Sequence, residues 1–299
     1  MPLADEDAAT TMSGVSDAVW RCRDHEFPLG ERTLVMGIVN VTPDSFSDGG
    51  LHAGPDDAIA HGLRLADEGA DILDVGGEST RPGSDPVPVD DELARVVPVV
   101  AGLREAAPAG VALSVDTRRP DVAQAAIDAG ASIVNDVTAA AEPAMLEVAR
   151  ATGTGLVLMH MLGEPKTMQV DPTYDDVVAE VLDFLARRIG AAVAAGLERD
   201  RLCVDPGIGF GKNLVHNLAL LHDIEAFERL RVPVLVGASR KRFIGQLTGV
   251  EEPAERVEGT AGAVAWCAAH GVDVVRVHDV LQMARVIRVV DAIARGAAS

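Results

Sequence analysis

Aromatic residues are scarce in this sequence, as are cysteines and long apolar runs. Only 3% of the 299 residues are Phe, Trp or Tyr, which argues against sugar-stacking clefts and against stacking platforms for single-stranded nucleic acid. The formal net charge of −20 argues further against nucleic acid, because phosphate backbones are bound by clustered Lys and Arg. We therefore expect no nucleic-acid partner.

The three cysteines, Cys22, Cys203 and Cys267, are far apart and match no C-x-x-C spacing for zinc or redox chemistry. We expect them to be reduced, mostly buried thiols. No apolar run reaches the roughly 18 residues that span a bilayer, and the first residues, MPLADED, show no basic or apolar leader. These absences predict a soluble, cytoplasmic protein with no membrane partner.

The apolar residues that are present, 48% of the chain, include eight short runs. The runs lie at residues 34–39, 71–75, 111–115, 132–134, 155–159, 202–204, 232–236 and 272–277. Between them, residues 56–68, 121–129, 174–195 and 281–294 have the apolar spacing of amphipathic helices. Eight strands, each followed by a helix, predict an α/β protein with a single (β/α)8 TIM barrel. A doubly wound open sheet is the alternative.

The barrel is expected to occupy residues 33–299 as one domain. Barrels of this length commonly fold as a single unit. Residues 1–32 match no strand–helix unit and are interpreted as a short N-terminal extension that caps the barrel.

Polar residues follow all eight runs. In a TIM barrel, chemistry takes place beyond the carboxyl ends of the strands, so these residues are site candidates. They are Asn40, Glu78, Ser79, Thr80, Arg81, Asp116, Asn135, Asp136, His160, Asp205, Ser239, Arg240, Lys241, Arg276 and His278. Any one of them alone could be a helix cap or a turn residue. Eight polar positions on one rim favour a binding site.

The candidates divide into two chemical groups. Asp116 and Asp205 only accept hydrogen bonds when ionised, so they suit the N–H groups of a heterocycle such as an amino-pyrimidinone, and Asn135 can both donate and accept. Arg81, Arg276, His278 and the Thr80 hydroxyl suit a phosphate or diphosphate. The alternative for the arginines is surface ion pairing, with Asp85 or Asp279. A heterocycle joined to phosphate fits both groups.

The segment GIGFGK at residues 207–212 resembles a nucleotide-binding loop but fails both tests for one. A Walker A loop needs Gly where Pro206 lies and Ser or Thr where Asn213 lies, and Lys212 occupies the third Gly place of the dinucleotide fingerprint. We interpret it as a glycine-rich loop that lets the backbone approach a ligand closely. A diphosphate ligand would bring Mg²⁺, to which Asn40 could offer an oxygen.

The motifs resemble those of the dihydropteroate synthase family. They are MGIVNVTPDSFSDGG at 36–50, DVGGESTRPG at 74–83, SVDT at 114–117, NDV at 135–137, LMHM at 158–161, PKTMQ at 165–169, DPG at 205–207, GASRK at 237–241 and RVHDV at 276–280. The likeness covers roughly residues 33–294. The chain departs from the family pattern at Thr138-Ala139-Ala140, where small, glycine-containing residues are usual.

The resemblance implies a transferase of folate biosynthesis that condenses 6-hydroxymethyl-7,8-dihydropterin diphosphate with p-aminobenzoate. It implies a pterin-binding TIM barrel that forms a homodimer and uses Mg²⁺ near Asn40. By the same resemblance the pterin is held by Asp116, Asn135, Asp205 and Lys241. The diphosphate is held by Asn40, Thr80, Arg81, Arg276 and His278, with Val277 beside them, while Ser239 and Phe210 border the p-aminobenzoate pocket. Arg276, His278, Lys241 and Arg81 are then the catalytic candidates.

The implied chemistry needs no strong base, because an aromatic amine is a neutral nucleophile at pH 7. We expect the loops at 42–50 and 162–172 to close over the site and exclude water. Two rival functions remain open at this point. One is a pterin-binding methyltransferase, which would not need the SRK and RVH groups, and the other is a non-catalytic pterin-binding paralogue.

Overall fold

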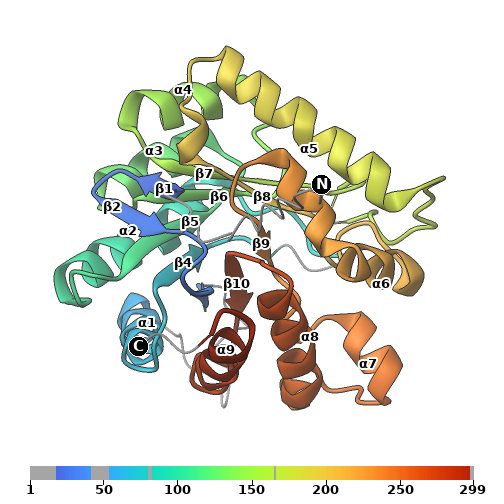
Figure 1. Ribbon diagram of the computed structural model, residues 1–299. Coiled ribbons are helices and arrows are strands. Elements are labelled where there is room, and N and C mark those ends of the chain that lie inside the picture. Colours follow the sequence, from blue (N-terminus) through green and yellow to red (C-terminus); the bar gives the residue numbers. More distant parts are fainter. Residues whose placement is uncertain (1–17, 42–53, 80–82, 165, 297–299) are drawn as a thin grey trace, which may run out of the picture.

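Eight parallel strands form a barrel that is surrounded by helices (Figure 1). The computed structural model describes residues 18–41, 54–79, 83–164 and 166–296. The barrel strands are β3 (Leu34–Asn40), β4 (Ile72–Gly76), β5 (Ala112–Asp116), β6 (Ile133–Asp136), β7 (Gly155–Met159), β8 (Leu202–Asp205), β9 (Leu235–Val236) and β10 (Val274–Val277). Their order is β8-β7-β6-β5-β4-β3-β10-β9, and a parallel bridge between Val204 and Val234 connects the two ends. The predicted (β/α)8 barrel is confirmed.

The helices follow the strands in turn. They are α1 (Pro55–Asp67), α2 (Val89–Ala106), α3 (Pro120–Asp128), α4 (Pro143–Thr152), α5 (Val177–Ala194), α6 (Leu214–His222), α7 (Arg242–Thr248), α8 (Val257–Ala269) and α9 (Val280–Ala294), with short 3-10 turns at Arg199–Arg201, Ile224–Leu230 and Pro253–Glu255. Three of them start at a proline. Proline has no amide hydrogen, and at the first position of a helix that hydrogen has no partner within the helix, so nothing is lost. The expected strand at 232–236 shortens to Leu235–Val236, since Pro233 cannot donate to a ladder.

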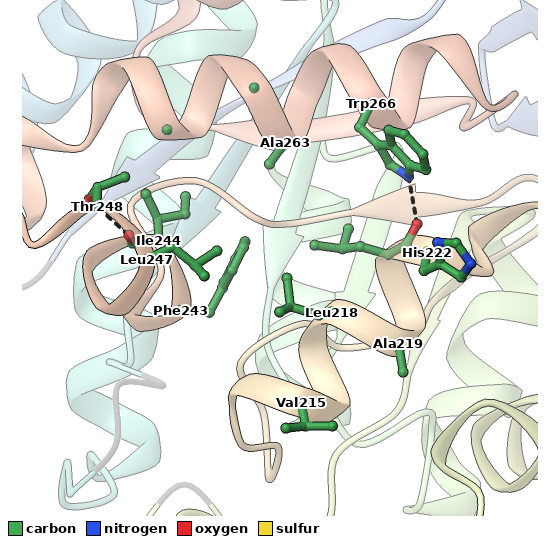
Figure 2. A pocket seen from close by; sticks show the side chains of 13 residues that line it. Val215, Leu218, Ala219, His222, Phe243, Ile244, Leu247, Thr248, Ala263 and Trp266 are labelled. Carbon is green, nitrogen blue, oxygen red and sulfur yellow. Dashed lines mark hydrogen bonds between the residues drawn. The ribbon is translucent and has the colours of Figure 1, made fainter.

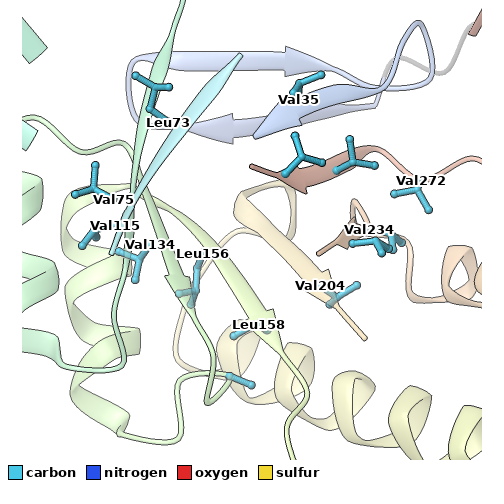
Figure 3. Close-up of a cluster of buried hydrophobic side chains, with 14 of the residues drawn as sticks. Val35, Leu73, Val75, Val115, Val134, Leu156, Leu158, Val204, Val234 and Val272 are labelled. Atoms are coloured by element: carbon cyan, nitrogen blue, oxygen red, sulfur yellow. The ribbon is translucent and has the colours of Figure 1, made fainter. Parts of the chain in front are cut away.

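Alternate residues of each barrel strand face opposite sides. The outward side chains pack against the helices and form the larger apolar core, which includes Val35, Leu73, Val115, Val134 and Val204 (Figure 3). The inward side chains at the amino ends of the strands form a second, smaller core. It contains Leu34, Met36, Ile72, Ala112, Ile133, Val157, Cys203, Leu235 and Val274. The inward positions nearer the carboxyl ends are mostly polar, so this end of the barrel holds the site.

A hairpin of β1 (Val19–Cys22) and β2 (His25–Pro28) packs against the amino end of the barrel (Figure 1). Its Trp20, Cys22 and Phe27 side chains are buried in the smaller core. Trp20 Nε1 donates to the Arg201 carbonyl oxygen at 3.3 Å, so the buried indole keeps a hydrogen-bond partner. The sequence did not predict these two strands.

All three cysteines are buried and unpaired, as expected. Of the helices in the described ranges, none has both the length and the apolar character to cross a bilayer.

Candidate active site

A cavity of about 760 Å³ opens at the carboxyl end of the barrel. Twelve of the site candidates named from the sequence line it: Asn40, Glu78, Ser79, Asp116, Asn135, Asp205, Phe210, Ser239, Arg240, Lys241, Arg276 and His278. Two more, Thr80 and Arg81, lie outside the described residues. Val277 does not line the cavity, because it is an outward residue of β10 that is fully buried in the larger core. The structure therefore brings together side chains that are up to 238 positions apart in the sequence, from Asn40 to His278.

Arg276 lies at the centre of a buried ion-pair network. Its Nε donates to Asp74 Oδ2 at 2.6 Å and its Nη2 donates to Asp116 Oδ2 at 2.8 Å. Asn135 Nδ2 also donates to Asp74 Oδ2, at 3.0 Å. Burial disfavours the charge on Arg276, but Asp74 and Asp116 more than offset this and raise its pKa. One guanidinium thus fixes residues of β4, β5 and, through Asp74, β6.

The two aspartates expected to bind the heterocycle are buried near cations. Burial raises the pKa of Asp116 to about 7, against the opposing effect of Arg276. Burial also raises the pKa of Asp205 to about 6, and Gly207 N opposes this by donating to Asp205 Oδ1 at 2.7 Å. Asn135 Oδ1 is buried and accepts no hydrogen bond within the described part of the chain. Buried acceptors of this kind favour a ligand that brings N–H groups.

Lys241 and Phe210 face each other in the cavity. Lys241 Nζ lies 3.9 Å from the centroid of the Phe210 ring, which is a cation–π contact. Burial lowers the pKa of Lys241 to about 8, with a further lowering from Arg276. The ammonium is therefore held between an aromatic face and the polar network around Asp205 and Asp116.

Ser239 and His278 form a second polar pair on the rim. Ser239 Oγ lies 3.0 Å from His278 Nδ1, and His278 N donates to Ser239 Oγ at 3.2 Å. Their neighbour Arg240 makes a bidentate ion pair with Asp279, with N···O distances of 3.0 and 2.6 Å. Surface ion pairing with Asp85 or Asp279 is the alternative for the site arginines, but Asp279 pairs with Arg240 and Asp85 pairs with Lys166.

Two candidates that follow strands, Asp136 and His160, do not line the cavity. Asp136 accepts from Thr138 N at 2.7 Å and from Ala140 N at 3.0 Å, so it caps a turn. That turn contains the departure from the family pattern, since Ala139 and Ala140 take left-handed φ values of 55° and 52°. The carboxylate of Asp136 thus helps to hold a backbone shape that glycine would adopt more readily. His160, the other one, contacts Lys212 instead.

Sequence reasoning missed Asp74 and Lys212. Asp74 lies inside a strand rather than beyond its end, and a carboxylate within the apolar run ILDV was the available signal. Lys212 lines the cavity, although in the sequence it is only the lysine of a loop that lacks the Walker A pattern.

The loop after β7 reaches across to the loop after β8. Gln169 Nε2 donates to the Gly209 carbonyl at 2.7 Å, and Tyr174 Oη donates to the Gly211 carbonyl at 2.9 Å. Met168 and Pro172 of this loop line the cavity. The other loop expected to close the site, residues 42–50, lies outside the described residues.

Active sites of TIM-barrel enzymes lie at the carboxyl rim, and the acidic acceptors and cationic donors gathered there suit a polar heterocycle that carries an anionic group. The model of the family described as "Pterin binding enzyme" matches residues 36–278. The chain therefore belongs to the pterin-binding enzyme family.

Within that family the similar proteins are dihydropteroate synthases. The Escherichia coli K12 dihydropteroate synthase is 48% identical over 258 residues, which cover 86% of this chain and 90% of that protein. The solved Xanthomonas albilineans dihydropteroate synthase with 4-aminobenzoic acid is 49% identical, covers 92% of this chain and 98% of its own, and has a TM-score of 0.86. A second structure from the same organism, in complex with 7,8-dihydropteroate, has a TM-score of 0.83 at 46% identity over 92% of this chain and 98% of its own. The predicted activity, that of a dihydropteroate synthase and so of a transferase, is confirmed.

Proposed function

We propose that the cavity binds 6-hydroxymethyl-7,8-dihydropterin diphosphate and p-aminobenzoate and joins them into dihydropteroate and diphosphate. The observation that carries this proposal is the arrangement around Arg276: buried acceptors on Asp116, Asn135 and Asp205 line the same cavity as the cations Arg276 and Lys241. The acceptors suit the N–H edge of the pterin. The cations suit the diphosphate. The relatives solved with 4-aminobenzoic acid and with 7,8-dihydropteroate support the same pair of substrates.

The chemical step breaks the C–O bond to diphosphate and forms a C–N bond to the amine, which loses a proton to water or to the departing diphosphate. The leaving group gains negative charge as the bond breaks. Arg276 and His278, together with Arg81, would then bind the diphosphate more tightly in the transition state than in the substrate, and that difference is what accelerates the reaction. Lys241 and Phe210 would hold the pterin and the amine in line.

The metal is part of the same proposal. Within the described ranges no group of three or more His, Cys, Asp or Glu side chains could hold an ion on its own. Asn40, at the end of β3, lines the cavity and offers an amide oxygen, a ligand type that Mg²⁺ accepts. Asn40 fits an ion that arrives bound to the diphosphate. Such an ion would take most of its other ligands from the diphosphate and from water. When bound, Mg²⁺ would neutralise charge on the leaving diphosphate.

The direct test is an assay of the purified chain with both substrates and Mg²⁺. We expect diphosphate release and dihydropteroate formation in equal amounts, and no diphosphate when p-aminobenzoate is omitted. Pterin binding measured by calorimetry, with no diphosphate released from the complete mixture, would instead support a non-catalytic pterin-binding protein.

We also propose that the chain forms a homodimer through an apolar face on α6, α7 and α8. A groove of about 700 Å³ lies between these helices (Figure 2). Its lining is Val215, Leu218, Ala219, Leu221, His222, Phe243, Ile244, Leu247, Thr248, Gly259, Gly262, Ala263 and Trp266. Val215 is 71% exposed and Leu247 is 56% exposed. Large apolar side chains gathered in this way mark an interaction surface.

The charge of the chain favours a second copy as the partner for this face. With a formal net charge of −20, two copies repel each other over most orientations. Among the described residues, the groove lining contains no Asp or Glu, and His222 is its one titratable side chain. A two-fold dimer places this same carboxylate-free surface on both sides of the contact.

Leu247→Asp should convert the dimer to a monomer, because it would bury a carboxylate against an apolar partner surface. Sedimentation velocity at micromolar concentration measures this change. The matched control is Ile293→Asp on α9, where the isoleucine is 78% exposed but lies outside the groove. A wild-type chain that sediments as a monomer, or a Leu247→Asp variant that stays dimeric, would contradict the proposed interface.

The compartment predicted from the sequence, the cytoplasm, is kept as part of this proposal. It is supported by the three unpaired, buried thiols, Cys22 in the hairpin, Cys203 in β8 and Cys267 in α8, since cysteines in reducing compartments remain unpaired.

A further inference from the structure

Lys212 is a buried lysine without a carboxylate partner in the described structure. It is 2% exposed, and Nζ lies 2.9 Å from His160 Nδ1, 3.0 Å from the Phe210 carbonyl oxygen and 3.5 Å from the His160 carbonyl oxygen. All three partners are neutral acceptors. Burial lowers the pKa of Lys212 to about 7, against the attraction of Asp205. Burying an ammonium in this way costs stability. We therefore expect the lysine at this position to have a function that offsets the cost.

His160 is built to accept this hydrogen bond. Burial lowers the pKa of His160 to about 3, with Lys212 adding to the effect, so the imidazole is neutral. Its ring packs edge-on against Phe184, with centroids 4.9 Å apart. His160 N also donates to the Asp205 carbonyl oxygen at 2.9 Å. Lys212 therefore connects the end of β7 to the loop after β8.

The glycines of this loop show how closely the two segments approach. A Cβ atom on Gly207 would lie 1.9 Å from the His160 carbonyl oxygen, and one on Gly211 would lie 2.6 Å from the Leu162 carbonyl oxygen. The GIGFGK loop is expected to bring its backbone close to a ligand. At Gly207 and Gly211, however, the segment that the backbone approaches is the loop after β7. Lys212 Nζ occupies the same gap, 3.4 Å from the position of a Gly207 Cβ.

Phe210 depends on this arrangement. Its carbonyl accepts from Lys212 Nζ, and its ring lies beneath Lys241 Nζ at 3.9 Å. A shift of the Phe210 backbone would therefore displace both the ring and the ammonium that rests on it. We propose that Lys212 is a positioning residue, which fixes Phe210, and through it Lys241, by joining His160 to the loop after β8. This inference rests on the proposed roles of Phe210 at the p-aminobenzoate pocket and of Lys241 at the pterin.

Lys212→Met tests it, because methionine fills a similar volume without any N–H donor. We expect the KM for p-aminobenzoate and the Kd for a dihydropterin each to rise about tenfold or more. A purely structural lysine predicts a different result: a changed Tm, with KM and Kd of the folded enzyme within twofold of the wild type. That result would overturn the proposal.

The same contact can be broken from its other side. His160→Leu removes the acceptor and should repeat the rise in KM and Kd, whereas His160→Asn keeps an oxygen close to the Nδ1 position and should restore most of the affinity. If Lys212→Met fails to fold, the two His160 variants provide the test. Equal KM values for His160→Leu and His160→Asn would refute the positioning role.

The double variant Lys212→Met/His160→Leu should be no worse than either single variant, since both remove one contact. Additive effects would count against the proposal. An inactive wild-type chain would instead refute the proposed function, so the two failures can be told apart.

Discussion

Replacing Arg276 with alanine should lower kcat by about 10²–10³, the range measured when one donor to a developing charge is removed. The side chain donates to Asp74 and Asp116 at 2.6 and 2.8 Å and lines the cavity, so it is already held in place before the leaving group gains charge. The pterin Kd should change much less than kcat, because the contribution of Arg276 grows along the reaction. Steady-state kinetics and calorimetry on the same preparation separate the two quantities.

The Arg276 variant will also lose stability, because Asp74 and Asp116 remain buried without their counterion. Breaking a buried pair in this way typically costs about 3–5 kcal/mol. Arg295→Ala is the matched control: Arg295 pairs with Asp291, and its side chain is 20% exposed, against 19% for Arg276. It should lower the free energy of unfolding but leave kcat unchanged. An Arg276→Ala effect confined to KM would show that this arginine binds the substrate without stabilising the transition state.

Much of the site could be predicted because a strand places alternate residues on opposite sides. Once the eight runs are found from their apolar residues, the polar residue beyond each run must lie on one rim. Asn40, Asp116, Asn135 and Asp205 were predicted in this way, and Arg276 was predicted from its place at the end of the last run. All five line one cavity, as a site on a single rim requires; that one end binds the heterocycle and the other the diphosphate stays a prediction.

The same alternation explains the candidates that do not line the cavity. Val277 follows the inward Arg276, Asp136 follows the inward Asn135, and each therefore faces the helices. The two-residue period of a strand, applied strictly, excludes both residues as site candidates. It would also have added Asp74, which lies two residues after the inward Ile72.

Contacts between loops could not be predicted from the sequence. The cation–π contact of Lys241 with Phe210 and the bond from Lys212 to His160 join segments whose spacing carries no periodic signal. The hairpin at the amino end of the barrel is a similar case. Residues 1–32 match no strand–helix unit, and Trp20 and Phe27 are buried only because the amino end of the barrel offers them an apolar surface.

Asp205→Ala should weaken dihydropterin binding by a factor of about 100 or more. The carboxylate is 5% exposed and its Oδ1 accepts from Gly207 N at 2.7 Å, so in the proposed complex its other lone pairs face the ring N–H groups. Removing it would leave those donors buried and unpaired, which costs about 1–3 kcal/mol for each group. Calorimetry with a dihydropterin measures the loss directly, and an affinity within twofold of the wild type would refute the proposed contact.

The pH dependence of binding gives a second measure of the same carboxylate. Burial raises the pKa of Asp205 to about 6 and that of Asp116 to about 7, so both groups gain protons as the pH falls from 8 to 5. A protonated carboxyl loses accepting capacity, and the pterin affinity should therefore fall with decreasing pH. In Asp205→Asn, whose side chain keeps the shape but cannot titrate, the step near pH 6 should disappear, while the step near pH 7, where Asp116 and Lys212 both titrate, remains. If the variant keeps both steps, the lower one belongs to a group other than Asp205, and the assignment of this carboxylate to the pterin edge is wrong.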